Sequence, residues 1–150
     1  MMRAVVQRVD RASVSVDEKM LSSIERGLVV FLGVEKGDGI AEADHILDKV
    51  INLRIFEDEA GKMNLSLLDT QGELMIISQF TLLGDCRKGR RPSFVAAEEP
   101  DQARDLYDHV VLRAGDKVRK VAAGEFRAMM TIHVVNNGPV TMLLDSRRVF

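Results

Sequence analysis

Two predominantly apolar segments limit the folds open to this chain more than any other feature of its sequence. They are Gly27-Leu-Val-Val-Phe-Leu-Gly-Val34 and Glu73-Leu-Met-Ile-Ile-Ser-Gln-Phe-Thr-Leu82. The first is continuously apolar, as expected of a strand covered on both faces, and the second is also predicted to be an interior strand, with polar residues at its far end. By contrast, Arg3–Val9 and Ala12–Val16 alternate polar with apolar or β-branched residues. This alternation predicts two short strands, each with one buried face.

Two further segments have the apolar periodicity of amphipathic helices. The apolar positions of the first are Ala43, Ile46, Leu47, Val50 and Ile51. Those of the second, which begins near Pro100 and ends near Gly115, are Ala103, Leu106, Tyr107, Val110 and Val111. We expect two main helices.

The C-terminal part of the chain predicts a pair of strands. Phe126–Val135 and Val140–Leu144 are rich in apolar and β-branched residues, and Asn136-Asn-Gly-Pro139 between them is a strong turn signal. A polar turn is also predicted at Glu57–Lys62.

These elements indicate an α+β fold with a largely antiparallel, barrel-like sheet. Because strands and helices follow no βαβ rhythm, we expect the two main helices to pack on one side of that sheet. A chain of 150 residues fits a single domain, residues 1–150, since domains commonly contain ~100–150 residues.

The composition restricts partners and compartment. The chain has 21 Lys and Arg against 23 Asp and Glu, so any contact with RNA requires a local basic patch. The one cysteine, Cys86, excludes an intramolecular disulfide and suits a reducing compartment. Neither a signal peptide nor an apolar run of ~18 residues is recognisable, and this predicts a cytoplasmic protein with no membrane contact.

The sequence offers few of the usual catalytic patterns. His45, His109 and His133 are isolated, without the paired spacing of metal ligands, so no metal is expected. No serine-hydrolase elbow, phosphate loop or dinucleotide fingerprint is found, and no cofactor is expected. Each histidine is interpreted as structural or solvated rather than catalytic. Arg87 and Lys88, next to Cys86, would favour a thiolate, but an incidental thiol in a basic loop is the preferred interpretation.

Two short motifs allow a more specific hypothesis. Ser78-Gln-Phe-Thr-Leu82 and Asn136-Asn-Gly-Pro-Val-Thr141 closely resemble the signature motifs of the D-aminoacyl-tRNA deacylase family. Segments that also resemble it, in the same order, are Arg3-Ala-Val-Val-Gln-Arg-Val9, Gly33-Val-Glu35, Leu53-Arg-Ile-Phe56, Gly61-Lys-Met-Asn64 and Arg91-Pro-Ser-Phe94. The chain departs from the family pattern at Asn137, usually aspartate, and at Gly84-Asp-Cys86, often Ala-Asp-Thr.

The resemblance implies an enzyme that hydrolyses the ester of D-aminoacyl-tRNA, with catalytic residues Ser78, Gln79, Phe80 and Thr81. In the family, the terminal ribose hydroxyl of the tRNA helps to break the ester, which fits the absence of a catalytic triad. The protein would then stabilise the oxyanion with backbone N–H donors at Gln79, Phe80 and Thr81. Thr81 as a nucleophile is the second hypothesis, because an unassisted hydroxyl is weak. Without the resemblance, Ser78 and Thr81 are ordinary strand residues.

The resemblance also assigns chiral selection to Gly138 and Pro139. It implies a cis peptide bond that enters the pocket of a partner subunit, and hence a homodimer with its active sites at the interface; otherwise a trans turn would be expected. A rigid backbone wall rejects L-amino acids whatever their side chain. Glycine escapes this wall, so glycyl-tRNA, including glycine mischarged on alanine tRNA, is an expected substrate.

Further residues are weaker candidates. Arg8 and Met130 are expected near the pocket by the same resemblance, although a charged strand residue and a core methionine are the default interpretations. Four basic residues that follow the first motif are predicted to contact tRNA phosphates, namely Arg87, Lys88, Arg90 and Arg91. The competing hypotheses are an RNA-binding module without turnover and a scaffolding homodimer.

Overall fold

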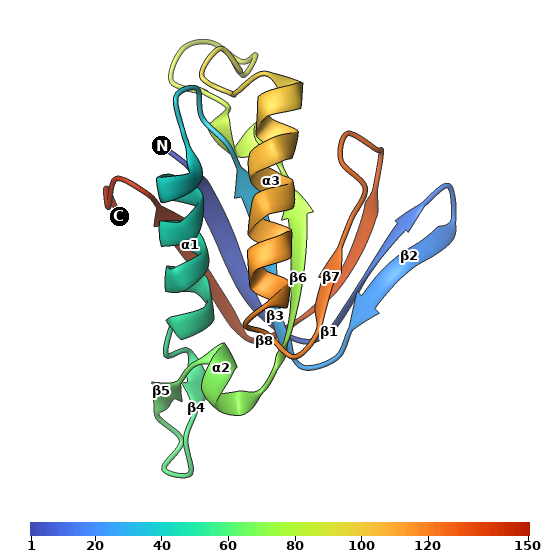
Figure 1. The fold of residues 1–150 in the computed structure, drawn as a ribbon, viewed down its shortest axis with the longest axis vertical. Coiled ribbons are helices and arrows are strands. Elements are labelled where there is room, and N and C mark those ends of the chain that lie inside the picture. Colours follow the sequence, from blue (N-terminus) through green and yellow to red (C-terminus); the bar gives the residue numbers. More distant parts are fainter.

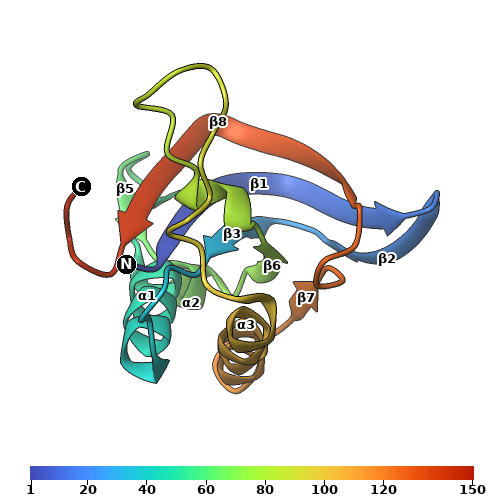
Figure 2. The ribbon, with the colours of Figure 1, turned by 90° about the horizontal axis from the view of Figure 1, so that it is seen from above.

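The computed structural model describes all 150 residues as a strongly curved sheet with helices on one side (Figures 1 and 2). The strands of the sheet are β1 (Arg3–Val16), β2 (Lys19–Ile24), β3 (Gly27–Gly33), β6 (Glu73–Ser78), β7 (Val121–Ala123) and β8 (Thr131–Asp145). The two main helices are α1 (Ile40–Asn52) and α3 (Pro100–Gly115). The smaller elements are β4 (Phe56–Glu57), β5 (Met63–Leu65), α2 (Leu67–Thr70) and the 3-10 helix η1 (Phe80–Leu83).

The sheet is mixed. The strand order is β2-β1-β3-β6-β7. Strand β8 lies outside this order and also pairs with β1. β1 pairs antiparallel with β2, β3 and β8, whereas β3, β6 and β7 pair parallel to one another. The prediction of an α+β fold with a barrel-like sheet and two main helices is confirmed, but the sheet is antiparallel only around β1.

The expectation that no βαβ units occur was wrong. Helix α1 lies between β3 and β6 in the chain, and α3 lies between β6 and β7. Both strand pairs are parallel, and a parallel pair needs a long crossover connection. The short elements β4, β5 and α2, which occupy part of the first crossover, hid this rhythm in the sequence.

Two short strands were predicted at each end of the chain, but each of these pairs is one long strand in the structure. β1 runs without interruption from Arg3 to Val16, and β8 runs from Thr131 to Asp145. The turn predicted at Asn136–Pro139 is therefore wrong, because these residues form an irregularity within β8. Turn residues do not reverse the chain here, since β1 pairs with β8 on both sides of the irregularity. Phe126–Met130, predicted as strand, precedes β8.

The apolar core occupies both faces of the central strands, as their sequences predict. Leu28, Val30 and Leu32 of β3 join a cluster of 22 buried residues that includes the inner sides of α1 and α3. Val29 of the same strand joins a second cluster of 8 residues on the opposite face. All five apolar positions predicted for the first helix are buried in α1. No helix combines the length and the apolar character needed to cross a bilayer.

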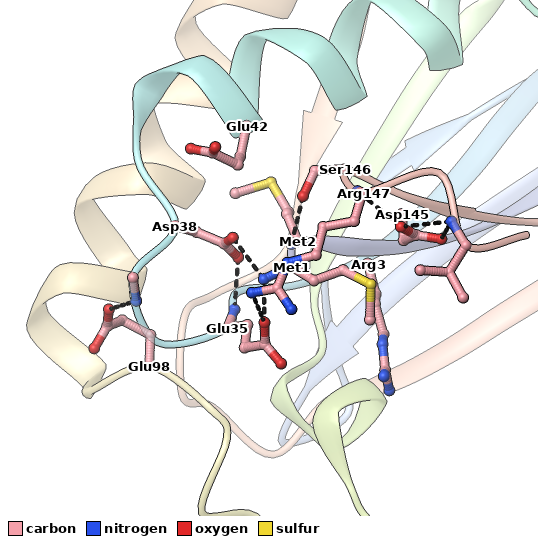
Figure 3. Close-up of polar contacts among 12 residues, drawn as sticks. Met1, Met2, Arg3, Glu35, Asp38, Glu42, Glu98, Asp145, Ser146 and Arg147 are labelled. Carbon is pink, nitrogen blue, oxygen red and sulfur yellow. Dashed lines mark hydrogen bonds and ion pairs between the residues drawn. The ribbon is translucent and has the colours of Figure 1, made fainter.

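A polar cluster ties the start of β1 to the end of β8 (Figure 3). The ammonium group of Met1 contacts the carboxylates of Glu35 and Asp38, the latter at 2.8 Å. Arg147 reaches the same Glu35 carboxylate at 3.0 Å, and Met2 donates its N–H to the hydroxyl of Ser146 at 3.0 Å. This cluster fixes the position of the neighbouring Arg3, which contacts the first motif.

Candidate active site

The first motif begins where β6 leaves the sheet. The N–H of Gln79 donates to the carbonyl oxygen of Leu32 at 2.8 Å, which continues the pairing of β6 with β3. The chain then turns into η1, whose first N–H groups belong to Phe80 and Thr81. No preceding turn of helix supplies acceptors for those two groups. The motif thus presents main-chain donors at the end of a buried strand.

Close packing holds η1 against β3. A Cβ atom on Gly33 would lie 2.6 Å from the Leu83 side chain and 2.9 Å from the Gln79 carbonyl oxygen. Only a glycine permits this approach without displacement. Arg3 adds a polar contact, because its guanidinium donates to the Leu82 carbonyl oxygen at 2.8 Å. Neither contribution was recognisable in the sequence, because both depend on segments far away along the chain.

The side chains of the motif contain no activated nucleophile. The Gln79 amide donates to the Thr81 hydroxyl, which has no hydrogen bond to a histidine or carboxylate. Ser78 is half-buried and its hydroxyl makes no hydrogen bond within the chain. Phe80 is 57% exposed, and its ring meets that of Phe94 edge-on with centroids 5.2 Å apart. The side chains of this motif therefore supply neither a general base nor an activated nucleophile.

The expectation of three free backbone donors needs a correction. The N–H of Gln79 already donates to Leu32 within the sheet, so it is not free to bind an oxyanion. The N–H groups of Phe80 and Thr81 remain as candidates. The sequence could not separate these positions, because the separation depends on where β6 stops pairing with β3.

The second motif forms an excursion of β8 away from its partner. Gln7 pairs with Thr141, and the next pair is Val9 with Asn136. Four residues of β8, 137–140, therefore lie opposite a single residue of β1, Arg8. The Gly138–Pro139 peptide bond is cis, as the resemblance implied, and Gly138 has a φ of 122°. Both residues are exposed, so the tip of the excursion faces solvent.

Arg8 supports this excursion from the sheet. It is only 6% exposed, and its guanidinium donates to the Ile55 carbonyl oxygen at 2.7 Å. The same guanidinium donates to the carbonyl and side-chain oxygens of Asn137, at 3.3 and 3.1 Å. A Cβ atom on Gly138 would lie 3.0 Å from Arg8. Sequence reasoning had Arg8 as a weak candidate and missed the role of Ile55.

Met130, the other weak candidate, packs against the second apolar cluster. A Cβ atom on Gly124 would lie 2.5 Å from the Met130 sulfur.

No hydrogen bond or ion pair joins Ser78–Leu82 to Asn136–Thr141 within one chain. The structure therefore builds the two motifs as separate parts of the protein.

The loop that follows η1 carries four basic residues between Asp85 and Ser93, and we call it the basic loop. Two hydrogen bonds between the backbones of Asp85 and Ser93, at 2.8 and 3.0 Å, close its base. Arg87 does not stand free, because its guanidinium donates to both Asp85 carboxylate oxygens at 2.9 and 2.7 Å. These hydrogen bonds hold the pKa of Asp85 well below its usual range and raise the pKa of Arg87. The other basic residues of this loop, Lys88, Arg90 and Arg91, are exposed and make no ion pair.

Two other residues with reactive or titratable side chains, His109 and Cys86, belong to neither motif. His109 pairs with Asp44 at 2.8 Å between α3 and α1. Cys86 is exposed and lines a surface cavity together with Arg3 and Glu35. No three or more His, Cys, Asp or Glu side chains gather where a metal ion would be held.

Comparison with known proteins identifies the family. The family model described as D-Tyr-tRNA(Tyr) deacylase matches residues 5–145. The chain belongs to this family. It is 60% identical over 149 residues to the D-aminoacyl-tRNA deacylase of Syntrophus aciditrophicus, covering 99% of this chain and all of that one. The D-aminoacyl-tRNA deacylase of Clostridioides difficile is 54% identical over the same length, again covering 99% of this chain and all of the relative.

Solved structures share the fold of this family member. A structure of the c-Myc DNA Unwinding Element Binding Protein superimposes with a TM-score of 0.91 at 41% identity, covering 95% of this chain and 97% of that one. A probable eukaryotic D-amino acid tRNA deacylase gives a TM-score of 0.78 at 19% identity, covering 96% and 98%. The second likeness shows the fold alone.

Proposed function

We propose that this protein hydrolyses the ester bond of D-aminoacyl-tRNA and releases the free D-amino acid and tRNA. The observation that carries the proposal is the first motif, which presents main-chain donors at the end of β6 and contains no activated nucleophile. Membership of the deacylase family agrees with this chemistry. Glycyl-tRNA, including glycine mischarged on alanine tRNA, is proposed as a second substrate.

The mechanism relies on positioning and on the main chain. The N–H groups of Phe80 and Thr81 stabilise the negative charge that develops on the ester carbonyl oxygen. The terminal ribose hydroxyl of the tRNA assists water in attacking the carbonyl carbon. The bond to the ribose oxygen then breaks, and this oxygen takes the proton. Loss of one oxyanion donor costs ~10²–10³ in rate in comparable sites, so two such donors are a substantial catalytic contribution.

Thr81 is the weaker candidate for the nucleophile. A threonine hydroxyl needs a nearby base, and the Thr81 hydroxyl instead accepts a hydrogen bond from the Gln79 amide. Replacing Thr81 with alanine is therefore expected to preserve most of the activity. Rate measurements on D-tyrosyl-tRNA check this, and a complete loss with an unchanged fold would favour Thr81 as the nucleophile.

The chiral filter is proposed to act between two subunits. Gly138 and Pro139 are exposed at the tip of the β8 excursion, and no hydrogen bond or ion pair joins them to the first motif of the same chain. The apolar side chain of Leu143, further along β8, is 57% exposed. A homodimer that covers this part of β8 would bring the tip to the partner's ester. Sedimentation at working concentration tests the dimer, and a monomer would contradict it.

Phosphates of the tRNA are proposed to bind Lys88, Arg90 and Arg91. These side chains are exposed and carry no ion pair, whereas the charge of Arg87 is already matched by Asp85. The logarithm of the binding constant falls linearly with the logarithm of the salt concentration. Each lost phosphate contact makes this slope shallower by about 0.7 for a single strand or about 0.9 for a duplex. The triple alanine variant should bind tRNA more weakly with a flatter salt dependence, and Arg87→Ala should change both less.

One assay tests the proposed activity. Purified protein is mixed separately with D-tyrosyl-tRNA, L-tyrosyl-tRNA and glycyl-tRNA, and ester loss is followed with time. The proposal expects turnover of the D and glycyl esters and little of the L ester. An intact D ester bound by the protein would instead indicate a nucleic-acid-binding module. No binding and no turnover would indicate a scaffolding role.

A further inference from the structure

We propose that Asp10 is a positioning residue for chiral selection, acting through its hydrogen bond to Asn137. The side-chain amide of Asn137 donates to the Asp10 carboxylate at 2.7 Å. This inference rests on the proposed role of the adjacent Gly138 and Pro139 as the chiral filter. It adds a residue outside both motifs to the determinants of substrate handedness.

The pairing of β1 with β8 explains why Asp10 can reach the excursion. Val9 faces Asn136 and Arg11 faces Val135, so β1 takes two steps where β8 takes one. Asp10 is therefore the extra residue of a bulge in β1, with no facing residue of its own. Bulges redirect side chains and occur near active sites. Asp10 is exposed, and its carboxylate is directed to Asn137.

Asn137 is held from two sides by groups of opposite charge. Its side-chain oxygen accepts from the Arg8 guanidinium at 3.1 Å, while its side-chain nitrogen donates to the Asp10 carboxylate at 2.7 Å. An amide is the side chain that satisfies both neighbours at once, because it carries an acceptor and a donor. The two contacts fix the amide orientation and hence the residue that directly precedes Gly138.

The contact with Asp10 is the outer of the two supports. Arg8 is buried and also bonded to Ile55, so its position depends on the core. Asp10 is exposed and carries no other hydrogen bond or ion pair. A hydrogen bond to an ionised group is stronger than a neutral one, yet an exposed one contributes little to global stability. Its removal should therefore loosen the tip of the excursion without unfolding the protein.

The test compares the rates on D-tyrosyl-tRNA and L-tyrosyl-tRNA, each normalised to glycyl-tRNA, which has no side chain to meet the wall. Asp10→Ala should lower the D-over-L ratio about tenfold, a change of about 1.4 kcal/mol. The conservative control Asp10→Asn should keep the ratio, because the amide oxygen of asparagine still accepts from Asn137. Thermal midpoints should be similar for all these variants.

Exchanging the acid and the amide between positions 10 and 137 tests the pairing itself. Asn137→Asp places a carboxylate oxygen against Asp10, so like charges repel while the contact with Arg8 is kept, and the D-over-L ratio should fall. The double variant Asp10→Asn with Asn137→Asp restores a donor facing an acceptor and should recover most of the ratio. A double variant as unselective as Asn137→Asp would overturn the proposal.

The Pro139→Ala variant separates this inference from the function on which it rests. If Pro139→Ala loses selectivity while Asp10→Ala keeps it, Asp10 has no positioning role and the filter stands. If Pro139→Ala keeps the wild-type ratio, or the wild type itself hydrolyses D and L esters equally, the proposed filter is absent and the inference falls with it.

Discussion

The two motifs of this protein are held in place by different forces. Ser78–Leu82 continues a buried strand, and η1 packs directly on the backbone of Gly33. Between Asn136 and Thr141, β8 leaves its pairing with β1, and side-chain hydrogen bonds from Arg8 and to Asp10 hold this excursion. The first motif is therefore positioned by core packing and main-chain pairing, and the second by a few polar contacts.

This difference predicts how each motif responds to change. Disturbing the packing beneath the first motif should lower rate and stability together, because the same contacts serve both. Disturbing the polar contacts around the second should alter selectivity more than stability, since hydrogen bonds contribute modestly to folding unless a buried partner is left unsatisfied. The following substitutions test this contrast.

The largest effect is expected from Gly33→Ala. The added Cβ would lie 2.9 Å from the Gln79 carbonyl oxygen, a backbone atom, so η1 must move. Overpacking of this kind costs about 1–3 kcal/mol, and a displacement of ~1 Å near the reacting groups costs ~10² in rate. Denaturant unfolding and kcat on D-tyrosyl-tRNA measure the two effects. Gly115→Ala, which meets open space, is the control, and equal behaviour of both variants would contradict the packing argument.

The second effect concerns the inner support of the excursion. Arg8→Leu leaves the Ile55 carbonyl oxygen without its donor and removes both contacts to Asn137. An unsatisfied buried acceptor costs about 1–3 kcal/mol. Selectivity should fall together with stability here, because Arg8 is buried. Arg8→Lys retains the charge but not the planar fork, and should recover only part of the D-over-L ratio in parallel rate assays.

A smaller effect is expected at Tyr107, whose hydroxyl donates to the Ile76 carbonyl oxygen of β6 at 2.7 Å. Burial raises the pKa of Tyr107 from 10.0 to about 12. Between these pH values the unfolded chain loses the phenol proton while the folded protein keeps it, so stability falls as pH rises through this window. Tyr107→Phe should lower the free energy of unfolding by about 1 kcal/mol at neutral pH. In unfolding experiments the free energy of unfolding of this variant should also decline less steeply as the pH rises from 10.0 to about 12. An unchanged decline would contradict the assignment.

The smallest effect is expected from Thr141→Val. Its hydroxyl accepts from the side-chain amides of Gln7 and Asn136, at 3.3 and 3.2 Å, and both contacts are exposed. Surface substitutions of this kind usually change the free energy of unfolding by less than about 0.5 kcal/mol. A thermal shift comparable with that of Arg8→Leu would show that the polar contacts of the second motif contribute more to folding than proposed.

Sequence patterns predicted the elements better than their connections. The periodicity of α1 and the apolar run of β3 report burial directly, so both were predicted correctly. The parallel pairing of β3 with β6 was missed, because pairing joins residues 46 positions apart, such as Gly27 and Glu73, through a crossover that contains small elements of its own. Asn136–Pro139 was read as a reversal because turn chemistry is local, whereas pairing on both sides by β1 keeps β8 continuous.

The sequence by itself determined which residue types lie in the two motifs, and family resemblance followed from those residues. It also determined the two-sided core, because apolar burial is encoded residue by residue along each strand. Only the tertiary structure decided that the Gln79 N–H is used within the sheet and that Asp10 meets Asn137. Both outcomes depend on the register between strands, which is a relation between distant segments and has no local signal in the chain.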